Sequence, residues 1–160
     1  MALPVYSSKD VFVAFGGRPL DGLAPDSFVT FSRSEDHTDE EVGSDGQLSV
    51  SISPNQSGTC TITLQQQSIA NNILAAIIGQ QDANRQLVIG DITITNPGGS
   101  TLAVMSNCHI KTSPETDFGN TATGKNRSWV FFCEKMLFSG SPSGSALFGA
   151  NLNFVNANTF

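Results

Sequence analysis

The chain has 160 residues, which predicts one domain over residues 1–160 with enough length to bury a core of normal size. A net charge of −6 and basic residues scattered along the chain exclude a general affinity for nucleic acid, because phosphate binding needs clustered Lys and Arg. Only 14% of the residues are charged, against about 25% in an average soluble domain, which indicates either a polar surface covered by other subunits or a β domain with a Ser- and Thr-rich exterior.

The N-terminal region begins without the features of a secreted protein. Residues 1–10 have neither the basic start nor the long apolar stretch of a signal peptide, and no apolar run in the chain approaches the roughly 20 residues of a membrane span. We therefore expect folding in a cytoplasm and no membrane insertion by this chain. Residues 11–15 predict a buried strand that ends at two glycines, and residues 28–33 predict a second strand with apolar side chains on both faces.

Residues 33–45 form an acidic segment that contains one apolar residue, Val42. Such a segment cannot bury enough apolar surface to order itself, so we expect a long loop that is mobile in a free subunit. Its acids do not follow the alternation of an EF-hand loop, which argues against a calcium site. The acidic residues are Glu35, Asp36, Asp39, Glu40, Glu41 and Asp45.

Residues 46–64 predict a β-hairpin with one apolar face. Leu48, Val50 and Ile52 alternate with polar residues, residues 54–58 have the composition of a turn, and the alternation then resumes to Leu64. The polar face of this hairpin would carry Gln47, Ser49, Ser51, Ser53, Thr59, Thr61 and Thr63.

A short amphipathic helix is predicted directly after the hairpin. Ser68 can cap its first turn, and Gly79 stands where a helix commonly ends in a left-handed residue. The apolar face of this helix would carry Ile69, Ile73, Leu74, Ile77 and Ile78.

The rest of the chain predicts further strands. Residues 87–110 alternate as a second hairpin, with a bulge at Gly90–Asp91 and a turn at residues 96–100. Residues 112–128 form a polar connection, and residues 129–138 are apolar enough to lie in the middle of a sheet or against a neighbouring subunit. The C-terminal residues alternate weakly and end at Phe160, which would be an anchor in an assembly.

The expected fold is mainly β: an antiparallel β-sandwich or barrel of about seven or eight strands, with one short helix packed on it and a long acidic loop.

No reaction centre is visible in the sequence. It lacks the G-x-S-x-G, H-E-x-x-H, Walker and dinucleotide motifs, so we expect no enzyme, no cofactor, no catalytic residue and no metal ligand. Cys108 and His109 are neighbours on a predicted strand and point to opposite faces, which prevents a shared metal. The cysteines are odd in number and have no C-x-x-C spacing; Cys60, Cys108 and Cys133 are expected to be free thiols in the core. A disulfide between two of them is the alternative, and a cytoplasmic compartment argues against it.

The order of motifs in residues 46–74 resembles that of the tail tube proteins of contractile-tailed bacteriophages, which are related in fold to the Hcp tube protein of type VI secretion. The pattern is a Gly-led strand, an N-x-S-G turn, a T-x-T-L strand, and S-x-x-N-x-x-L at a helix start. The residues that match it are Gly46, Asn55, Ser57, Gly58, Thr61, Thr63, Leu64, Ser68, Asn71 and Leu74.

This resemblance implies a structural virion protein that is assembled in the host cytoplasm. Its subunits would form hexameric rings that stack into a tube inside a contractile sheath, with tail terminator and baseplate proteins as further partners. The acidic segment would reach the next ring, and the polar face of the hairpin would line a channel through which DNA passes without specific binding. Six subunits of −6 would carry −36 per ring and repel DNA, with Asp91 and Glu134 as candidates for charge in the channel.

Two other functions remain open at this stage. A secreted Hcp-type ring protein of a secretion system would share the fold. A β-sandwich module that binds carbohydrate or calcium would be a monomer with exposed aromatic side chains in a concave site, whereas this chain has one Trp and one Tyr.

Overall fold

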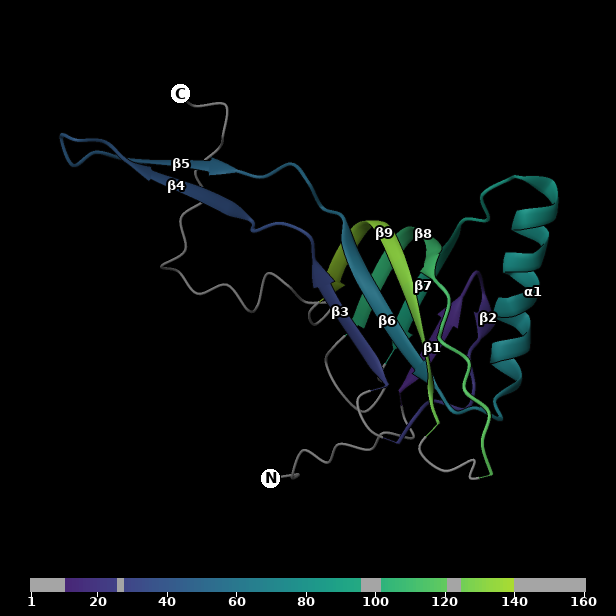
Figure 1. The fold of residues 1–160 in the computed structure, drawn as a ribbon. Helices are drawn as coiled ribbons and strands as arrows, with labels where there is room; N and C mark the ends of the chain where they lie inside the picture. The colour runs from purple at the N-terminus through teal and green to yellow at the C-terminus, as the bar shows by residue number, and fades with distance from the viewer. Residues whose placement is uncertain (1–10, 26–27, 96–101, 121–124, 140–160) are drawn as a thin grey trace.

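The computed structural model describes residues 11–25, 28–95, 102–120 and 125–139, and Figure 1 shows their arrangement. In chain order the elements are β1 (Phe12–Phe15), β2 (Arg18–Pro19), β3 (Val29–Arg33), β4 (Thr38–Val42), β5 (Leu48–Ile52), β6 (Gly58–Leu64), α1 (Ile69–Asn84), β7 (Gly90–Thr95), β8 (Leu102–Thr112) and β9 (Arg127–Ser139). The prediction of a mainly β protein with one helix is confirmed.

Seven of these strands form one antiparallel sheet in the order β2-β1-β7-β8-β9-β6-β3. The apolar strand β9 lies in the middle of this sheet, between β8 and β6, as predicted. Among the described strands the sheet is not closed into a barrel, because β2 and β3 are its edges. It is strongly curved instead: Leu23, which follows β2, forms an isolated bridge with Leu64 at the far end of β6. The fold is therefore sandwich-like.

The core lies inside this curve. The ring of Phe15 on β1 lies with its centroid 5.2 Å from that of Phe131 on β9, although two strands separate β1 from β9 in the sheet. All three cysteines are free and buried in this core, which confirms the prediction for Cys60, Cys108 and Cys133.

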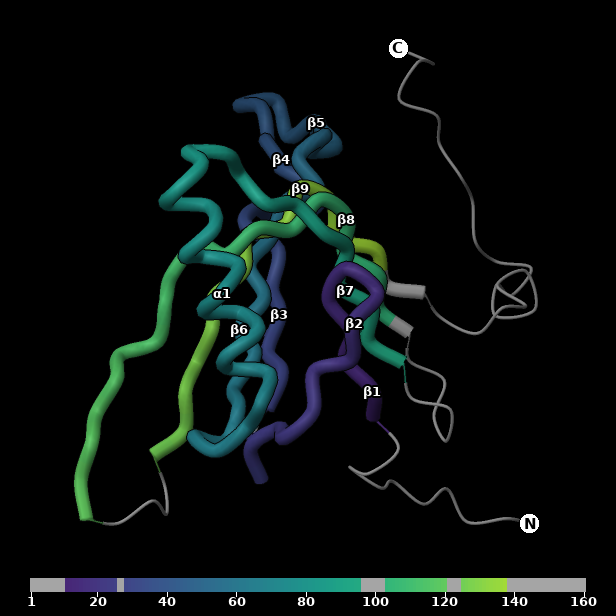
Figure 2. The backbone as a smooth tube through the Cα atoms, turned by 90° about the vertical axis from the view of Figure 1, so that its right-hand side faces the viewer, coloured from purple at the N-terminus to yellow at the C-terminus, as the bar shows by residue number. Residues whose placement is uncertain are grey.

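Helix α1 packs against one side of the sheet and runs in front of β6 in Figure 2. Ser68 caps it as predicted, with its hydroxyl accepting a hydrogen bond from the backbone N–H of Ala70 at 3.2 Å. The buried Asn71 ties the helix to the sheet: its Oδ1 accepts from Trp129 Nε1 at 2.9 Å, and its Nδ2 donates to the Gln65 carbonyl at 2.8 Å.

Two details of the predicted helix are wrong. The helix does not end at Gly79 but continues to Asn84 and ends at Arg85, which has a φ of 52°. An interior glycine costs only about 1 kcal/mol relative to alanine, and this cost is offset by the hydrogen bonds of a further turn. Ile69 is also 76% exposed, because the inward face of the helix is centred on the buried Leu74 and begins at Ala70.

The predicted hairpin of residues 46–64 is wrong in its pairing. Strand β5 pairs with β4, in register from Thr38 opposite Ile52 to Val42 opposite Leu48, whereas β6 pairs with β3 and β9. The true turn is Gly43–Gln47, and Gly46 has the left-handed φ of 82° that such a turn requires.

The acidic segment is consequently not an irregular loop: part of it is the strand β4. Residues 29–42 and 48–64 run antiparallel to each other, through the β3–β6 pair and then the β4–β5 pair. Between these two pairs, the Ser34 N–H donates to the Ser57 carbonyl and the Ser53 N–H donates to the His37 carbonyl. Residues 54–57 interrupt the second of these strands without reversing the chain. We call the β4–β5 ribbon, residues 38–52, the arm; it projects from the sheet, away from α1 (Figure 1).

The second predicted hairpin is confirmed in its pairing, since β7 pairs with β8. The register shifts between Gly90 and Ile92, which confirms the predicted bulge. Its turn at residues 96–100 and the C-terminal apolar residues lie outside the described part of the chain.

Candidate assembly surface

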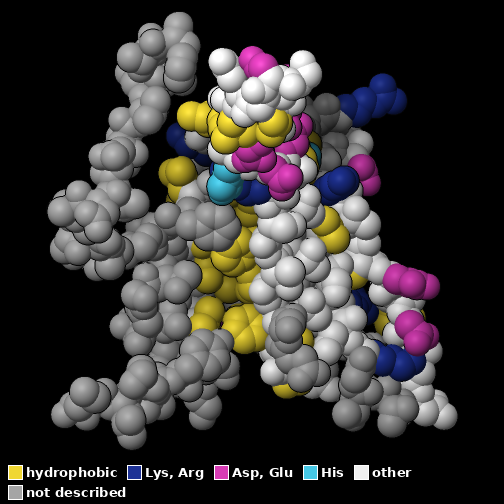
Figure 3. All heavy atoms as spheres, turned by 90° about the vertical axis from the view of Figure 1, so that its left-hand side faces the viewer, with side chains coloured by type: hydrophobic (Ala, Val, Ile, Leu, Met, Phe, Trp, Pro, Cys, Tyr) yellow, Lys and Arg dark blue, Asp and Glu magenta, His cyan; other side chains and the backbone are white. Residues whose placement is uncertain are grey.

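The arm has two chemically different faces, because residues directly opposite each other on paired strands point to the same side. What we call the apolar arm face carries Val42, Leu48, Val50 and Ile52, together with Thr38 and Glu40. What we call the acidic arm face carries Asp39, Glu41, Ser49 and Ser51. Figure 3 shows hydrophobic side chains gathered on the arm beside acidic ones.

The apolar arm face is exposed along its whole length. The exposed fractions of its apolar side chains are 66% for Val42, 63% for Leu48, 51% for Val50 and 62% for Ile52. An isolated two-stranded ribbon is marginally stable in water, and a contiguous exposed apolar face marks a contact with another molecule. The arm is therefore the strongest candidate for an assembly surface in the described chain.

Polar contacts hold the base of the arm to the sheet. The guanidinium of Arg33 at the end of β3 contacts the ring of His37 and donates from Nη2 to the Asn55 carbonyl at 2.6 Å. The Ser53 hydroxyl donates to Glu35 Oε2 at 3.1 Å. A hollow of about 490 Å³ lies here, lined by Glu35, Asp36, Thr38, Asp39, Ser51, Ile52, Ser53 and Pro54.

The six acidic residues of the acidic segment, which was predicted to reach the next ring, do not form one surface. Glu35 and Asp36 lie at the base of the arm, and Asp45 lies in its turn, where Oδ1 accepts from the Gln47 N–H at 3.1 Å. On β4, Asp39 and Glu41 belong to the acidic arm face. Glu40 belongs to the apolar arm face, where it accepts a hydrogen bond from Thr38 at 2.6 Å.

The residues predicted to form the polar face of the hairpin, and so to line the channel, are likewise divided between the arm and the sheet. Gln47, Ser49, Ser51 and Ser53 lie in or next to the arm, whereas Thr59, Thr61 and Thr63 lie on β6. The threonines are half-buried and alternate with the buried side chains of the same strand. In register with them on the edge strand β3 lie Ser32 and Thr30, so a row of small hydroxyl side chains continues across the two strands.

The two candidates for channel charge, Asp91 and Glu134, are brought together at the bulge. Both are exposed, and Asn107 joins them: its backbone N–H donates to Asp91 Oδ1 at 3.1 Å and its Nδ2 donates to Glu134 Oε2 at 2.6 Å. Asn107 has a φ of 53°, a left-handed conformation that asparagine tolerates better than most residues. Asn107 was not among the predicted site residues. An asparagine in a strand opposite a predicted bulge is the feature of the sequence that could have identified it.

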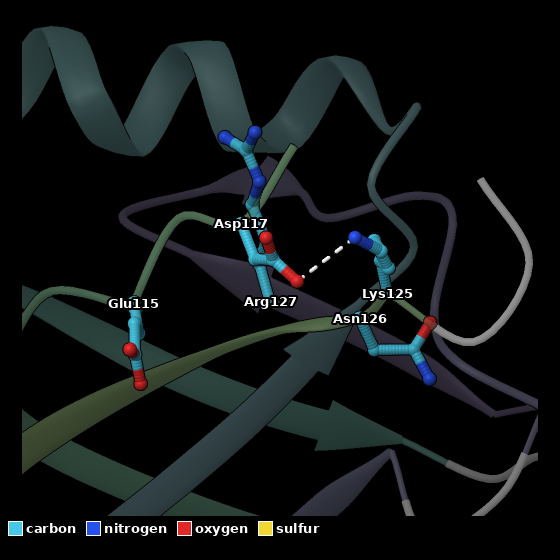
Figure 4. Close-up of a pocket in the computed structure, with 5 residues that line it drawn as sticks. All are labelled: Glu115, Asp117, Lys125, Asn126 and Arg127. Atoms are coloured by element: carbon cyan, nitrogen blue, oxygen red, sulfur yellow. Dashed lines mark hydrogen bonds and ion pairs between the residues drawn. The ribbon is translucent and has the colours of Figure 1, made fainter. Parts of the chain in front are cut away.

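A second hollow, of about 360 Å³, lies between the end of β8 and the start of β9, and Figure 4 shows its lining residues. Lys125 Nζ forms an ion pair with Asp117 Oδ2 at 2.8 Å, and the Arg127 guanidinium lies 5.9 Å from the centroid of the Phe118 ring. Exposed pairs of this kind contribute about 0–1 kcal/mol. The hollow is an open polar surface of mixed charge.

The described residues contain no group of three or more His, Cys, Asp or Glu that could hold a metal ion. Within the same residues, no helix is long and apolar enough to cross a membrane.

Comparison with solved structures shows the fold. The chain is 18% identical to the tube-terminating cap of the anti-feeding prophage, with a TM-score of 0.58 and coverage of 88% of this chain and 95% of that one. It is 18% identical to a sheath/tube terminator of the extracellular contractile injection system PVC, with a TM-score of 0.54 and coverage of 85% and 97%. It is 19% identical to a chain of the sheath-tube complex of PVC, with a TM-score of 0.53 and coverage of 84% and 90%.

The chain has no match among the curated protein sequences. A protein family does match, and over most of the chain: the family described as bacteriophage PhiTE tail tube protein covers residues 20–138. This range contains the arm, the helix and five of the seven strands of the sheet, with β1 and β2 before it and the last residue of β9 after it. The chain thus belongs to the family of the bacteriophage PhiTE tail tube protein.

Proposed function

We propose that this chain, as one tube-forming domain, is the subunit of a tail tube built from stacked hexameric rings, and that the arm joins one copy of the chain to another. The observation that carries this proposal is the apolar arm face, which has four apolar side chains that are at least half exposed. No other contiguous set of this kind is found on an element that projects from the sheet in the described chain.

The energy of covering the arm is large enough for a specific contact. Full burial of one Val, Leu or Ile side chain contributes about 1.5–3 kcal/mol. Because 51–66% of each of these side chains is exposed, covering all four would contribute about 4–7 kcal/mol before the entropic cost of association. Glu40 lies on the same face opposite Val50, so its carboxylate would have to reach water at the side of the ribbon, while the acidic arm face would stay in water.

The edges of the sheet supply a second contact, within a ring. Strand β3 is an edge of the seven-stranded sheet and offers a row of backbone groups to another strand. In a closed ring of identical subunits, the backbone groups of each edge can pair with the neighbouring subunit, so that no edge remains unpaired. We assign the ring contact to this edge and the stacking contact to the arm.

The channel would be lined by the hydroxyl row of β6 and β3 and by the carboxylates at the bulge. Small uncharged hydroxyl side chains give DNA no specific partner, and Asp91 with Glu134 adds negative charge that repels phosphate. The sheath, the terminator and the baseplate are the partners that such a tube needs along its outside and at its ends. The assembled protein would be part of the virion and would be built in the host cytoplasm.

A matched pair of variants on one strand tests the role of the arm. Val50→Asp places a charge on the apolar arm face, and Ser51→Asp places the same charge on the acidic arm face next to it. Neither side chain is part of the core, so both variants should fold. By electron microscopy and sedimentation, V50D should lose stacked tubes, whereas S51D should form them as the unmodified protein does.

Equal tube formation by the two variants would contradict the proposed arm contact. Loss of tubes in S51D alone would place the contact on the acidic arm face and would also contradict the proposal. Circular dichroism of each variant separates these outcomes from a failure to fold.

A further inference from the structure

We propose that Cys108 and Cys133 are a site of covalent modification: they close an intramolecular disulfide between the two central strands β8 and β9 when the protein meets a thiol oxidant. This inference depends neither on the ring nor on the arm. It rests on the placement of the two thiols in the core.

The two cysteines are already in contact. They lie directly opposite each other in the register of β8 and β9, both are free, and their sulfur atoms are 2.7 Å apart. The Cα atoms of opposed residues in an antiparallel pair are about 4.5–5.5 Å apart, and disulfides span Cα separations of about 4.4–6.8 Å. The bond can therefore form without displacement of the strands.

The third thiol is in the same core but is not part of the pair. The residue of β9 opposite Cys60 is Phe131, and the residue of β6 opposite Cys133 is Gly58, so Cys60 lies out of register with Cys133. Burial raises the pKa of Cys60 to about 12, which leaves it protonated near neutral pH. The hydrogen bond with Cys133 lowers the pKa of Cys108, which makes Cys108 the nucleophile of the pair.

The reaction balances with a named oxidant. The Cys108 thiolate attacks the nitrogen–nitrogen double bond of an azodicarboxamide such as diamide. Cys133 then loses its proton and attacks the Cys108 sulfur, which expels the hydrazine. Two sulfur–hydrogen bonds are broken, one sulfur–sulfur bond is formed, and two electrons and two protons pass to the oxidant.

Access to the pair comes from the bulge. Cys108 follows the exposed Asn107, which interrupts the regular ladder, and Cys133 precedes the exposed Glu134. Local opening at an irregular part of a sheet needs less free energy than unfolding of the whole chain. In a reducing cytoplasm the pair stays as thiols, and in oxidising surroundings the disulfide ties the centre of the sheet together.

The test treats the reduced full-length protein with diamide under native conditions, then unfolds it, labels the remaining thiols with N-ethylmaleimide and measures the intact mass. The unmodified chain has three cysteines, and we expect the label count to fall from three to one in a monomer, with a linked peptide containing Cys108 and Cys133. The Cys60→Ser variant should lose its two labels in the same way.

Three labels retained after native treatment, while urea-unfolded protein is oxidised under the same conditions, would overturn the proposal. A linkage that includes Cys60 or a second chain would also overturn it.

Discussion

The buried Asn71 should be the most sensitive polar position in the described fold. Its side chain is 2% exposed, accepts from Trp129 and donates to the Gln65 carbonyl. The change Asn71→Ala leaves the buried Trp129 Nε1–H without a partner, whereas the Gln65 carbonyl keeps its hydrogen bond from the Ser68 N–H. One such buried group costs about 1–3 kcal/mol. The expected loss is therefore about 1–3 kcal/mol of the free energy of unfolding, out of a total that is about 5–15 kcal/mol for a typical domain.

Urea unfolding followed by tryptophan fluorescence measures this loss directly, since the chain has one tryptophan and it is the partner of Asn71. The matched control is Asn72→Ala, which removes the same side chain from the next position of the helix, where it is exposed. Exposed changes of this kind alter stability by about 0.5 kcal/mol or less. Equal midpoints for the two variants would refute the view that Asn71 fixes the helix to the sheet.

Three further predictions concern the sheet. Gly58→Ala should lower the free energy of unfolding by about 1–3 kcal/mol in urea, because the added Cβ would lie 2.5 Å from the backbone oxygen of Ser32; a stability equal to that of the unmodified protein would count against the packing described. Burial raises the pKa of the Cys60 thiol from 9.0 to about 12, so the unfolded chain ionises at a lower pH than the folded chain. The free energy of unfolding that the buried neutral thiol contributes is therefore full below pH 9 and is lost between pH 9 and pH 12; Cys60→Ser should remove this part of the decline in stability with pH. Replacing Asp91 and Glu134 with Lys should slow DNA ejection from assembled particles, and unchanged ejection kinetics would refute their role in the channel.

Local patterns in the sequence predicted most elements of the fold. The alternation in β5 to β9 and the serine cap of α1 are properties of neighbouring residues, and the structure has strands and a helix start at those places. The pairing of β5 could not be predicted in the same way. Residues 54–58 have the composition of a turn, but residues 54–57 only interrupt a long strand, which resumes at Gly58 and whose partner begins at Val29.

The acidic segment shows why composition alone was misleading. The prediction of a loop considered only the apolar surface that residues 33–45 could bury, whereas β4 is ordered by backbone pairing with β5 and leaves its side chains exposed. The proximity of Asp91 and Glu134 was also beyond sequence reasoning. It depends on the left-handed Asn107, which is in β8 and far from both in the chain.

Copies of this chain should assemble into rings and tubes. The direct test of this assembly is negative-stain electron microscopy of the purified protein over a range of concentrations. We expect rings or stacked tubes about 100 Å across, the width of a hexamer of domains of this size, with the fraction in tubes rising with concentration. A uniform monomer at every concentration would contradict it.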